Sequence, residues 1–485
     1  MARYWWNVVA VLGMAIVPAL VPTMGLAQTD PAKPLTRIAF GSCANQDKPL
    51  PIYEKIADAK PELLLLLGDT IYADLERSRK VTTEVIQEKY ETLAKLPGWQ
   101  RLKATCPMLA TWDDHDYGKN DAGVEWPLKD ESQRIFHDFF GTPADSPRRT
   151  QKGVYSATTF GPVGKRTQII LLDTRYFRSK LKSGSPQTIA PYGLIRTPYV
   201  PNTDADATML GDDQWKWLET QLKEPADLRL LCSSIQVVSE EHPFEKWGNM
   251  PAERNRLFKL IQDTGASGVV ILSGDRHLGE LSLTTSAIGY PLYDITSSGL
   301  NQGAPKWREQ EKNKHRVSSM PYGDHFGFIT IDWSDEPTVS LQLRDDQGEI
   351  TLRQKFPISL LQAKDKPKDA EPPKEQPKLP PGVLTPAEAI KKVGEVVTVQ
   401  YVVKGGRAVN DGKRILLNSD ADFRSKENFT VVLNEKGMTD KHEKATYDTF
   451  KDKTIRAKGK VTVYKDSPQI QIDEAKDLEI IEVKK

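Results

Sequence analysis

Hydrophobic and polar positions from Thr36 onwards follow the pattern of alternating strands and helices. Five consecutive leucines begin at Leu63 and end before Gly68, which predicts a strand buried on both faces. Val81, Val85 and Leu93 recur at helical spacing, so an amphipathic helix is expected after it. The other predicted strands are Arg37 to Cys43, Met108 to Trp112, Thr167 to Leu172, Leu228 to Val238, Gly268 to Leu272, Phe326 to Trp333, Val339 to Arg344 and Ile350 to Phe356. This order predicts a layered α/β fold.

Three more helices are indicated by their end signals. Ile52 to Ala59 reads as a short helix, and Asp212 as the N-cap of a helix that carries Trp215. Pro251 opens another helix, which Gly265 is expected to end. The last predicted strands have no helices between them, so the sheet should finish antiparallel.

A change in composition divides the chain into two domains. Residues 362–381 are rich in Lys, Glu, Asp and Pro and predict an extended linker between a domain at 35–361 and a second one at 382–485. The second domain shows short strand-like runs and one early helix, which favours a small β-barrel.

The first residues of the chain have the pattern of an export signal. Arg3 precedes an apolar run from Val8 to Val21, and small residues follow up to Ala27. This order predicts a signal peptide over residues 1–27 and a secreted or periplasmic protein. A membrane anchor would need roughly 20 uninterrupted apolar residues, so no stable anchor is expected.

Charge and cysteine content narrow the function classes. With 67 basic and 66 acidic residues the formal charge is +1, so no global field attracts nucleic acid or an anionic membrane. Only Cys43, Cys106 and Cys232 are present, which excludes a disulfide framework. An unpaired thiol in an exported protein points to metal ligation.

Four groups of ligand-type residues follow predicted strands. They are Cys43, then Asp69 with Tyr72 and Asp74, then the run Asp113-Asp114-His115-Asp116, and finally Asp275-Arg276-His277. Each group has an ordinary interpretation when taken alone: a buried thiol, a turn, a charged loop or an ion pair. At equivalent strand ends their charges would repel, and a pair of divalent or trivalent cations removes that conflict. The pattern therefore predicts a metal site.

Arg175 follows the predicted strand Thr167 to Leu172. Its guanidinium is placed to bind a phosphate oxygen, or to form a structural salt bridge, and the sequence leaves both interpretations open.

The sequence resembles the alkaline phosphatase D (PhoD-like) family of binuclear metallophosphoesterases. The likeness extends from about Leu35 to Leu361. It rests on the four groups above and, in addition, on the ordered motifs Phe40-Gly41-Ser42, Trp112-Asp113-Asp114-His115, Leu172-Asp173-Thr174-Arg175 and Gln214-Trp215-Lys216-Trp217-Leu218.

The resemblance implies a four-layer αββα sandwich and a binuclear or trinuclear centre of Fe³⁺ with Ca²⁺. It implies that Cys43 and Tyr72 hold the iron and that Asp69 bridges metals. The remaining ligands implied by the match are Asp74, Asp114, Asn120, Asp275 and His277. It also implies that His115, beside Asp114, stabilises the leaving group.

The chain departs from the family pattern in two respects. Members often carry an additional β domain before the catalytic one, whereas here the first motif closely follows the predicted signal peptide. Asp116 also stands where a Glu is commoner, which bears on Asn120 and on the choice of metals.

The second domain resembles an oligonucleotide/oligosaccharide-binding (OB) barrel. From Pro381 onwards it has 20 basic and 17 acidic residues, a difference of only 3, and Tyr401, Phe423, Phe429 and Tyr464 could stack on bases or sugars or pack in a core. An oligonucleotide or saccharide ligand is the expectation for this domain.

The function expected from these features is hydrolysis of phosphomonoesters or phosphodiesters by a metal-bound hydroxide outside the cytoplasm. In that scheme Arg175 neutralises phosphoryl oxygens and His115 assists the leaving oxygen. The alternative hypothesis is a secreted binding protein that acts through its OB-like tail and carries an inactive phosphatase-like domain. The motifs do not select the physiological substrate.

Overall fold

The structure is a computed structural model that describes residues 30–76, 78–362, 379–410, 412–420, 428–439, 442–451, 453–464 and 467–481. The chain divides into two units, one that ends at Lys366 and one that begins at Pro367. The predicted signal peptide at residues 1–27 lies outside the described residues, as does the predicted linker apart from its first and last residues. Both therefore stay predictions.

The leucine run forms β2 (Leu63–Leu67), a fully buried strand of the first sheet. The sheet has the order β16-β15-β14-β1-β2-β3. Its other strands are β1 (Arg37–Gly41), β3 (Met108–Thr111), β14 (His325–Asp332), β15 (Thr338–Asp345) and β16 (Ile350–Pro357). β1, β2 and β3 are parallel, whereas β14 to β16 pair antiparallel, as the missing helices between them predicted.

A second six-stranded sheet has the order β12-β13-β11-β10-β5-β4. Its strands are β4 (Ser156–Phe160), β5 (Thr167–Leu171), β10 (Leu228–Ser233), β11 (Val269–Ser273), β12 (Gly279–Thr284) and β13 (Leu292–Ser297). The inner four are parallel, and the edge strands β4 and β12 are antiparallel. The strand predicted over Leu228 to Val238 is shorter, and β4, β12 and β13 were not predicted.

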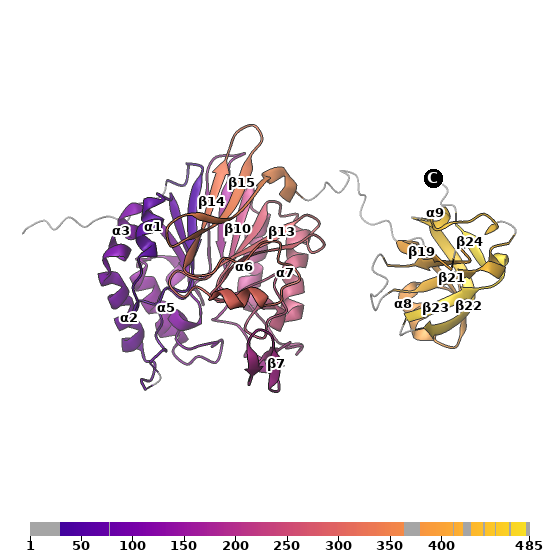
Figure 1. Cartoon of the computed structure of the whole chain (residues 1–485), viewed down its shortest axis with the longest axis horizontal. Helices are drawn as coiled ribbons and strands as arrows, with labels where there is room; N and C mark the ends of the chain where they lie inside the picture. Colours follow the sequence, from indigo (N-terminus) through magenta and orange to yellow (C-terminus); the bar gives the residue numbers. More distant parts are fainter. Residues whose placement is uncertain are drawn as a thin grey trace, which may run out of the picture. The chain divides into compact units, whose positions relative to one another are not determined.

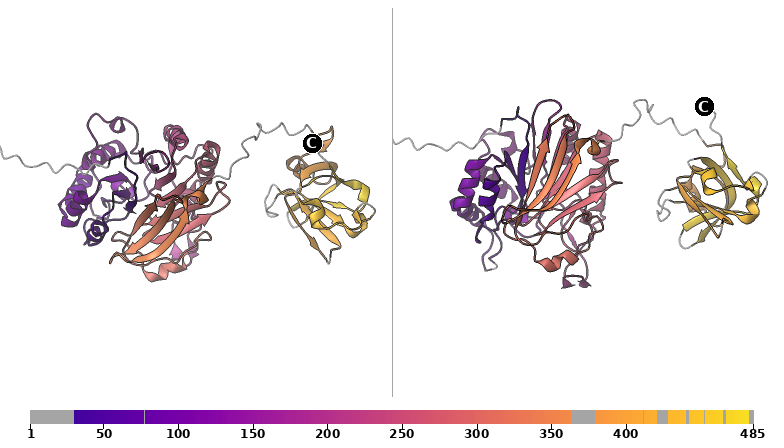
Figure 2. Two further views of the ribbon diagram at one scale, coloured as in Figure 1. Left: turned by 90° about the horizontal axis from the view of Figure 1, so that it is seen from above. Right: turned by 45° about the horizontal axis from the view of Figure 1, so that its top comes forward.

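Helices cover the outer faces of the two sheets, which gives the four-layer sandwich (Figures 1 and 2). Successive leucines of β2 point to opposite faces of the sheet. Leu65 packs between the two sheets, whereas Leu64 and Leu66 pack against the helices. Those helices are α1 (Ile52–Asp58), α2 (Thr83–Lys95), α3 (Pro97–Thr105) and α5 (Lys129–Phe139). On the second sheet lie α6 (Gly211–Lys223) and α7 (Pro251–Thr264).

Helix ends agree with the sequence in one case and differ in another. Gly265 ends α7 in the left-handed conformation, with φ of 66°, as a glycine permits without strain. The prediction that Asp212 is the N-cap of α6 is wrong, because Leu210 occupies that position and the helix begins at Gly211.

Short elements fill the loops at the strand ends. Between β5 and α6 lie two small antiparallel ladders, β6 (Lys182–Ser183) with β9 (Tyr199–Val200) and β7 (Gln187–Ile189) with β8 (Gly193–Ile195). The part that carries β7 projects from the first unit (Figure 1). The other short helices are α4 (Asp114–Tyr117), η1 (Pro147–Arg149), η2 (Trp247–Asn249), η3 (Lys306–Gln310) and η4 (Ile358–Leu361).

The second unit is built mainly from strands around its own hydrophobic core. The strands are β17 (Val383–Leu384), β18 (Val396–Val402), β19 (Gly405–Val409), β20 (Arg414–Asn418), β21 (Thr430–Asn434), β22 (Thr454–Tyr464), β23 (Ser467–Ile472) and β24 (Leu478–Ile480). The helices are α8 (Pro386–Ala389), η5 (Ile390–Lys392), η6 (Glu435–Gly437), α9 (Tyr447–Phe450) and η8 (Ala475–Asp477). Pairing runs from β17 to β19 as an open path, and no ladder between described residues closes it, so the OB-like barrel stays a prediction.

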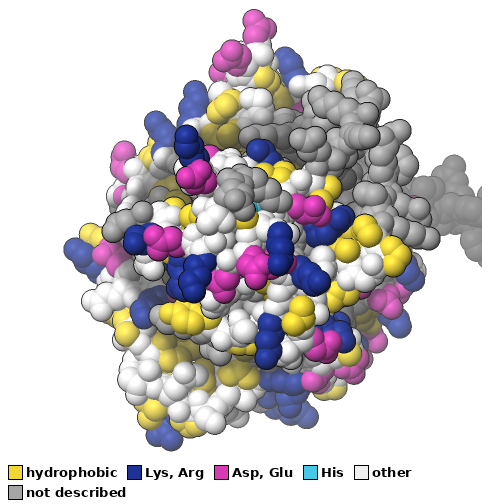
Figure 3. Space-filling view, turned by 90° about the vertical axis from the view of Figure 1, so that its right-hand side faces the viewer, with side chains coloured by type: hydrophobic (Ala, Val, Ile, Leu, Met, Phe, Trp, Pro, Cys, Tyr) yellow, Lys and Arg dark blue, Asp and Glu magenta, His cyan; other side chains and the backbone are white. Residues whose placement is uncertain are grey.

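The four aromatic residues of the second domain that could stack on a ligand differ in burial. Tyr401 and Phe429 are buried in the core of the second unit, whereas Tyr464 is exposed and Phe423 lies outside the described residues. Basic and acidic side chains are interspersed on the face shown in Figure 3. Among the residues that the structure describes, no helix has the length and apolar character needed to cross a membrane.

Deletion of residues 363–485 is expected to leave the first unit folded, since each unit has its own core. We expect its thermal unfolding midpoint to stay within about 2 °C of the matching transition of the whole chain, which corresponds to less than about 1 kcal/mol. Calorimetry measures this shift. A chain cut at Gly348, which lacks β16, is the control and should be clearly destabilised. A comparable fall in the unfolding midpoint after deletion of residues 363–485 would contradict the view that the two units fold independently.

Candidate metal centre

Ligand-type side chains gather at the carboxyl ends of parallel strands from both sheets. Cys43 follows β1, Asp69 follows β2, and Asp275 follows β11. The two sheets meet at this edge, because Ser42 and Ser298 form an isolated parallel bridge and the Ser42 N–H donates to the Ser297 carbonyl at 3.1 Å. Loops that are far apart in the sequence thus converge at one place.

The backbone is strained at the same edge. Of the seven non-glycine residues with positive φ among the described residues, five are Cys43, Asp69, Asp121, Asp275 and His277. Left-handed backbone is unfavourable for residues with a Cβ and is typical of functional sites. Gly68 adds a close approach, since a Cβ there would lie 2.4 Å from the Cβ of Asp113.

The first set of donor atoms surrounds one oxygen of Asp69. The Cys43 thiol donates to Asp69 Oδ2 at 3.4 Å, and the Tyr72 hydroxyl donates to the same oxygen at 3.1 Å. Tyr72 OH also lies 3.1 Å from Nε2 of His277. The ligand atoms of Cys43, Asp69 and His277 all lie within 4.8 Å of one another. Thiol, phenol, imidazole and carboxyl groups therefore face the same small volume.

Further donor sets share Asp114, which follows β3. Its carboxylate lies within 4.8 Å of ligand atoms in three pairs of residues, namely Asp69 with His115, Asp113 with Asp275, and Asp121 with Glu245. Because Asp69 and Asp114 each belong to more than one set, both carboxylates are placed to bridge neighbouring cations.

The protonation of this cluster shows why cations fit it. Burial raises the pKa of Asp69 and Asp275 well above the ordinary value, and the neighbouring carboxylates raise it further. Burial also raises the pKa of Asp113 to about 7 and that of Asp121 to about 8. Buried acidic groups that repel one another are stabilised by bound cations, so the residues present fit a multi-metal centre.

The two histidines of the site differ in charge. Burial, together with the positively charged side chains of Arg308, His115 and Arg276, lowers the pKa of His277 to about 3. Its imidazole is therefore neutral and able to bind a metal. Burial acts to lower the pKa of His115 as well, but the carboxylates of Asp114 and Asp69 raise it well above the ordinary value.

Asp74 lies in none of the donor sets of the described residues, so its predicted role as a ligand stays a prediction. Its Oδ1 pairs with Nδ1 of His115 in a short hydrogen bond, and its Oδ2 accepts from the Asn120 N–H at 2.7 Å. Asp74 therefore orients the His115 ring, because both carboxylate oxygens are already engaged.

Asn120 lies next to the donor sets, and its predicted role as a ligand stays a prediction. Its side chain is exposed, and its amide Nδ2 donates to Asp121 Oδ2 at 2.5 Å. The next residue faces the cluster: the Asp121 N–H donates to Asp114 Oδ2 at 2.6 Å, and the Asp121 carboxylate lies near those of Asp114 and Glu245.

Arg175 is fully buried and forms ion pairs. Its Nε donates to Asp113 Oδ1 at 2.6 Å, and its Nη1 donates to Glu245 Oε2 at 2.6 Å. Of the two interpretations from the sequence, these contacts match the structural salt bridge. The guanidinium thus holds Asp113 and Glu245 in place, and its contact with phosphate stays a prediction.

Three residues of the site were missed in the sequence. Asp121 stood in a charged segment that carried a signal, whereas Glu245 follows no predicted strand. Ser298 follows β13, which was not predicted; its Oγ lies 3.1 Å from the Cys43 sulfur and accepts from the His277 N–H at 2.7 Å.

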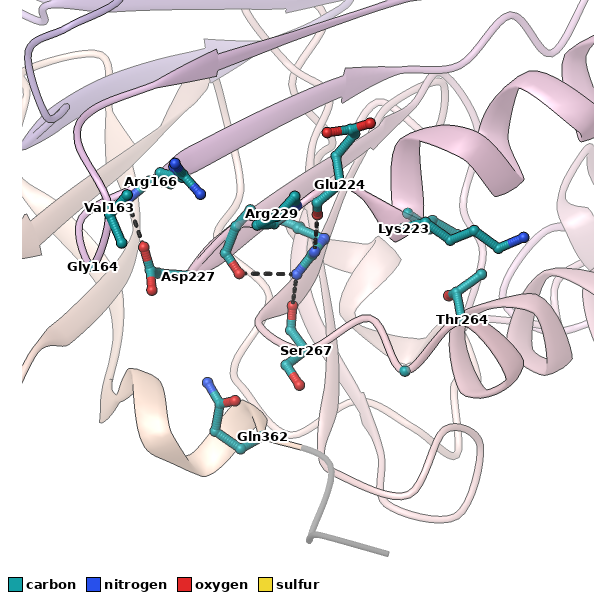
Figure 4. Close-up of a pocket in the computed structure, with 14 residues that line it drawn as sticks. Val163, Gly164, Arg166, Lys223, Glu224, Asp227, Arg229, Thr264, Ser267 and Gln362 are labelled. Carbon is teal, nitrogen blue, oxygen red and sulfur yellow. Dashed lines mark hydrogen bonds between the residues drawn. The ribbon is translucent and has the colours of Figure 1, made fainter. Parts of the chain in front are cut away.

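A hollow of about 340 Å³ lies elsewhere, at the amino ends of β5, β10 and β11 (Figure 4). Arg229 lines it, but its guanidinium donates to the backbone carbonyls of Glu224, Ala226 and Ser267. Because the metal-ligand cluster is at the opposite ends of these strands, this hollow is no part of that site.

Comparisons with known proteins agree with this fold. Residues 38–337 match the model of the PhoD-like phosphatase family. Alkaline phosphatase D of Bacillus subtilis (strain 168) is 25% identical in an alignment of 294 positions, and the match covers 52% of this chain and 48% of that protein. The chain thus spans about half the length of this curated relative.

Two solved structures match this chain. A structure of PhoD matches with a TM-score of 0.53 and 18% identity, over 68% of this chain and 70% of the other. The purple acid phosphatase from yellow lupin (Lupinus luteus) seeds matches with a TM-score of 0.45 and 12% identity, over 68% of this chain and 55% of the other. The PhoD structure supports the sandwich fold.

Removal of bound metal with a chelator is expected to destabilise the first unit, since the buried carboxylates then lack their cations. A metal present at 100 times its Kd would contribute about 2.7 kcal/mol to the free energy of unfolding. Elemental analysis and thermal unfolding before and after chelation measure this effect. An Asp69→Asn variant should show a smaller difference, whereas Asp335→Asn, at the opposite ends of the strands, should behave like the wild type. An unchanged midpoint on metal loss would exclude this role.

Proposed function

The chain belongs to the PhoD-like phosphatase family, and we propose that it hydrolyses phosphoesters at a multi-metal centre on this edge of the sandwich. The observation that carries the proposal is the sharing of Asp69 and Asp114 between adjacent donor sets. Such shared carboxylates hold cations close enough to act on one phosphoryl group.

The two ends of the site suit different cations. Cys43, Tyr72 and His277 around Asp69 would hold a ferric ion, because a thiolate and a phenolate suit an iron centre better than a calcium one. The carboxylates of Asp114, Asp121 and Glu245 offer only oxygen, the donor that Ca²⁺ prefers. Bound cations of this kind neutralise charge on phosphoryl oxygens and lower the pKa of water.

His115 is proposed as the residue that donates a proton to the leaving oxygen. The Asp74 carboxylate holds Nδ1 in a short hydrogen bond and stabilises a proton on that nitrogen. The Tyr72 ring lies against the imidazole with centroids 4.3 Å apart, which fixes its plane. Nε2 makes no hydrogen bond to the described residues, so that nitrogen is available to the substrate.

Arg175 is proposed as a positioning residue. It pairs with Asp113 and Glu245, and Arg178 forms an ion pair with the other Glu245 oxygen, with Nε 2.9 Å from Oε1. Two buried guanidiniums thus hold Glu245 beside Asp121 and Asp114. Loss of Arg175 would leave unpaired carboxylates in a dry site, which is strongly unfavourable.

Other parts of the proposal rest on the sequence. Residues 35–361 are proposed as the catalytic domain, and the pattern from Arg3 to Ala27 supports export from the cytoplasm. Both phosphomonoesters and phosphodiesters fit the chemistry of the site. An inactive phosphatase-like domain is disfavoured, because strained and buried ligand-type residues are costly to keep without a bound cation.

Asp69→Asn is expected to lower kcat for 4-nitrophenyl phosphate or bis(4-nitrophenyl) phosphate by more than about 100-fold. Even outer partners of metal ligands contribute roughly 10–100-fold, and Asp69 is shared by two donor sets. Asp335→Asn makes the same chemical change in an exposed turn and should keep wild-type rates. Absence of turnover of any phosphoester by the metal-loaded wild type would refute the proposed function.

The iron assignment predicts a colour. With Fe³⁺ bound, a phenolate or thiolate ligand should give a visible charge-transfer band, and Tyr72→Phe should shift or remove it. Tyr53→Phe is the matched control, because Tyr53 is equally buried in α1 and its hydroxyl has no partner in the structure. An active, colourless protein that contains only Ca²⁺ or Zn²⁺ would contradict the roles of Cys43 and Tyr72.

A further inference from the structure

We propose that an aromatic cluster of Tyr192, Phe244 and Trp307 binds an aromatic ring on the alcohol part of the phosphoester. This inference rests on the proposed function and names the class of substrate. The cluster brings together the loop between β7 and β8, the segment before η2, and η3. Tyr192 meets Phe244 with ring centroids 4.9 Å apart and Trp307 with centroids 5.7 Å apart, both edge to face.

The first link between the cluster and the metal centre is Arg276, which stands between Asp275 and His277. Its guanidinium lies over the Phe244 ring, with Cζ 4.5 Å from the centroid, and Nη2 donates to the Tyr192 hydroxyl at 3.3 Å. One side chain thus joins the loop of two metal ligands to two rings of the cluster.

Two further contacts join the same segments to the acidic end of the site. Glu245 directly follows Phe244, and its carboxylate lies within 4.8 Å of ligand atoms of Asp114 and Asp121. Tyr199, in β9, donates its hydroxyl proton to Asp121 Oδ2 at 2.7 Å, and its N–H bonds to the Pro243 carbonyl at 2.7 Å. The aromatic cluster therefore lies beside the donor sets.

Buried charges hold the cluster in position. Arg308 donates from Nε to the Tyr192 hydroxyl at 3.2 Å, and its Cζ lies 5.5 Å from the Tyr192 centroid. Arg276 and Arg308 both bind Oε2 of Glu311, at 2.8 and 3.2 Å. Since all three charged residues are buried, Tyr192 is fixed rather than free to change orientation.

The cluster is not part of the hydrophobic core. None of its three residues belongs to a core cluster of the described residues, and the Trp307 side chain is 48% exposed. An ordered and partly open group of aromatic rings beside a polar site is typical of ligand binding. Ring edges and faces with a guanidinium nearby bind a planar aromatic group by stacking and cation–π contact.

The test compares two esters that differ only in the ring, benzyl phosphate and cyclohexylmethyl phosphate, each also as its methyl diester. The two alcohols are similarly basic, so the bond to be broken is matched, and a difference reports on binding of the ring. We expect kcat/KM of the wild type to favour the benzyl esters about tenfold, mainly through KM, as one base–aromatic stack would give.

Variants assign that preference to the cluster. Trp307→Leu keeps an apolar side chain and should lower kcat/KM for the benzyl esters to about that for the cyclohexylmethyl esters. Trp307→Phe keeps an aromatic ring and should keep most of the preference. Tyr192→Phe removes only the hydroxyl contacts of Arg276 and Arg308 and should weaken it less than Trp307→Leu. Val163→Ala, on an exposed residue at the amino ends of the strands, should leave the preference unchanged.

The outcomes separate this inference from the proposed function. If both benzyl and cyclohexylmethyl esters are hydrolysed with equal kcat/KM, or if Trp307→Leu keeps the preference, the aromatic subsite is refuted and the phosphoesterase stands. Equal binding of the saturated ring would point to a sugar-like arm instead. If no phosphoester is hydrolysed by the metal-loaded wild type, the proposed function fails and this inference fails with it.

Discussion

The repulsion among buried carboxylates at one edge of the sandwich is the constraint on which the rest of the site depends. Asp69, Asp113 and Asp114 are buried, and the half-buried Asp275 lies beside the last two. Burial and the neighbouring carboxylates raise the pKa of Asp69, Asp113 and Asp275, whereas for Asp114 the effect of burial is outweighed by His115 and Arg175, which lower its pKa below the ordinary value. Bound cations would favour the charged forms of all four, which links metal binding to folding at this edge.

The fold keeps these carboxylates together by joining two sheets. The bridge between Ser42 and Ser298 brings the Cys43 loop to the end of β13, and Ser298 then contacts both Cys43 and His277. Cys43, Asp69, Asp275 and His277 have left-handed backbone, and Gly68 closely approaches Asp113. Both features restrict the conformation of these loops. Local strain is tolerated there because the buried strands below are rigid.

A second layer of residues orients the first. Asp116 accepts hydrogen bonds from the N–H groups of Asp113 and Thr70, Asp74 holds His115, and Arg175 holds Asp113. Asp74 and Asp116 resemble metal ligands in the sequence, since they are the same residue type as the ligands and stand in the same motifs. Only their hydrogen bonds distinguish a carboxylate that faces a cation from one that supports its neighbour.

The sequence by itself determined the layered fold and most of the centre, because buried strands and the polar residues after them are local patterns. Cys43, Asp69, Asp114 and His277 were found in this way. Tertiary structure alone decided which carboxylates converge, since Asp121 and Glu245 arrive from loops without a periodic pattern. It also placed Arg175 in an ion pair with Asp113 and Glu245, because a side chain's role depends on contacts across segments that are distant in the sequence.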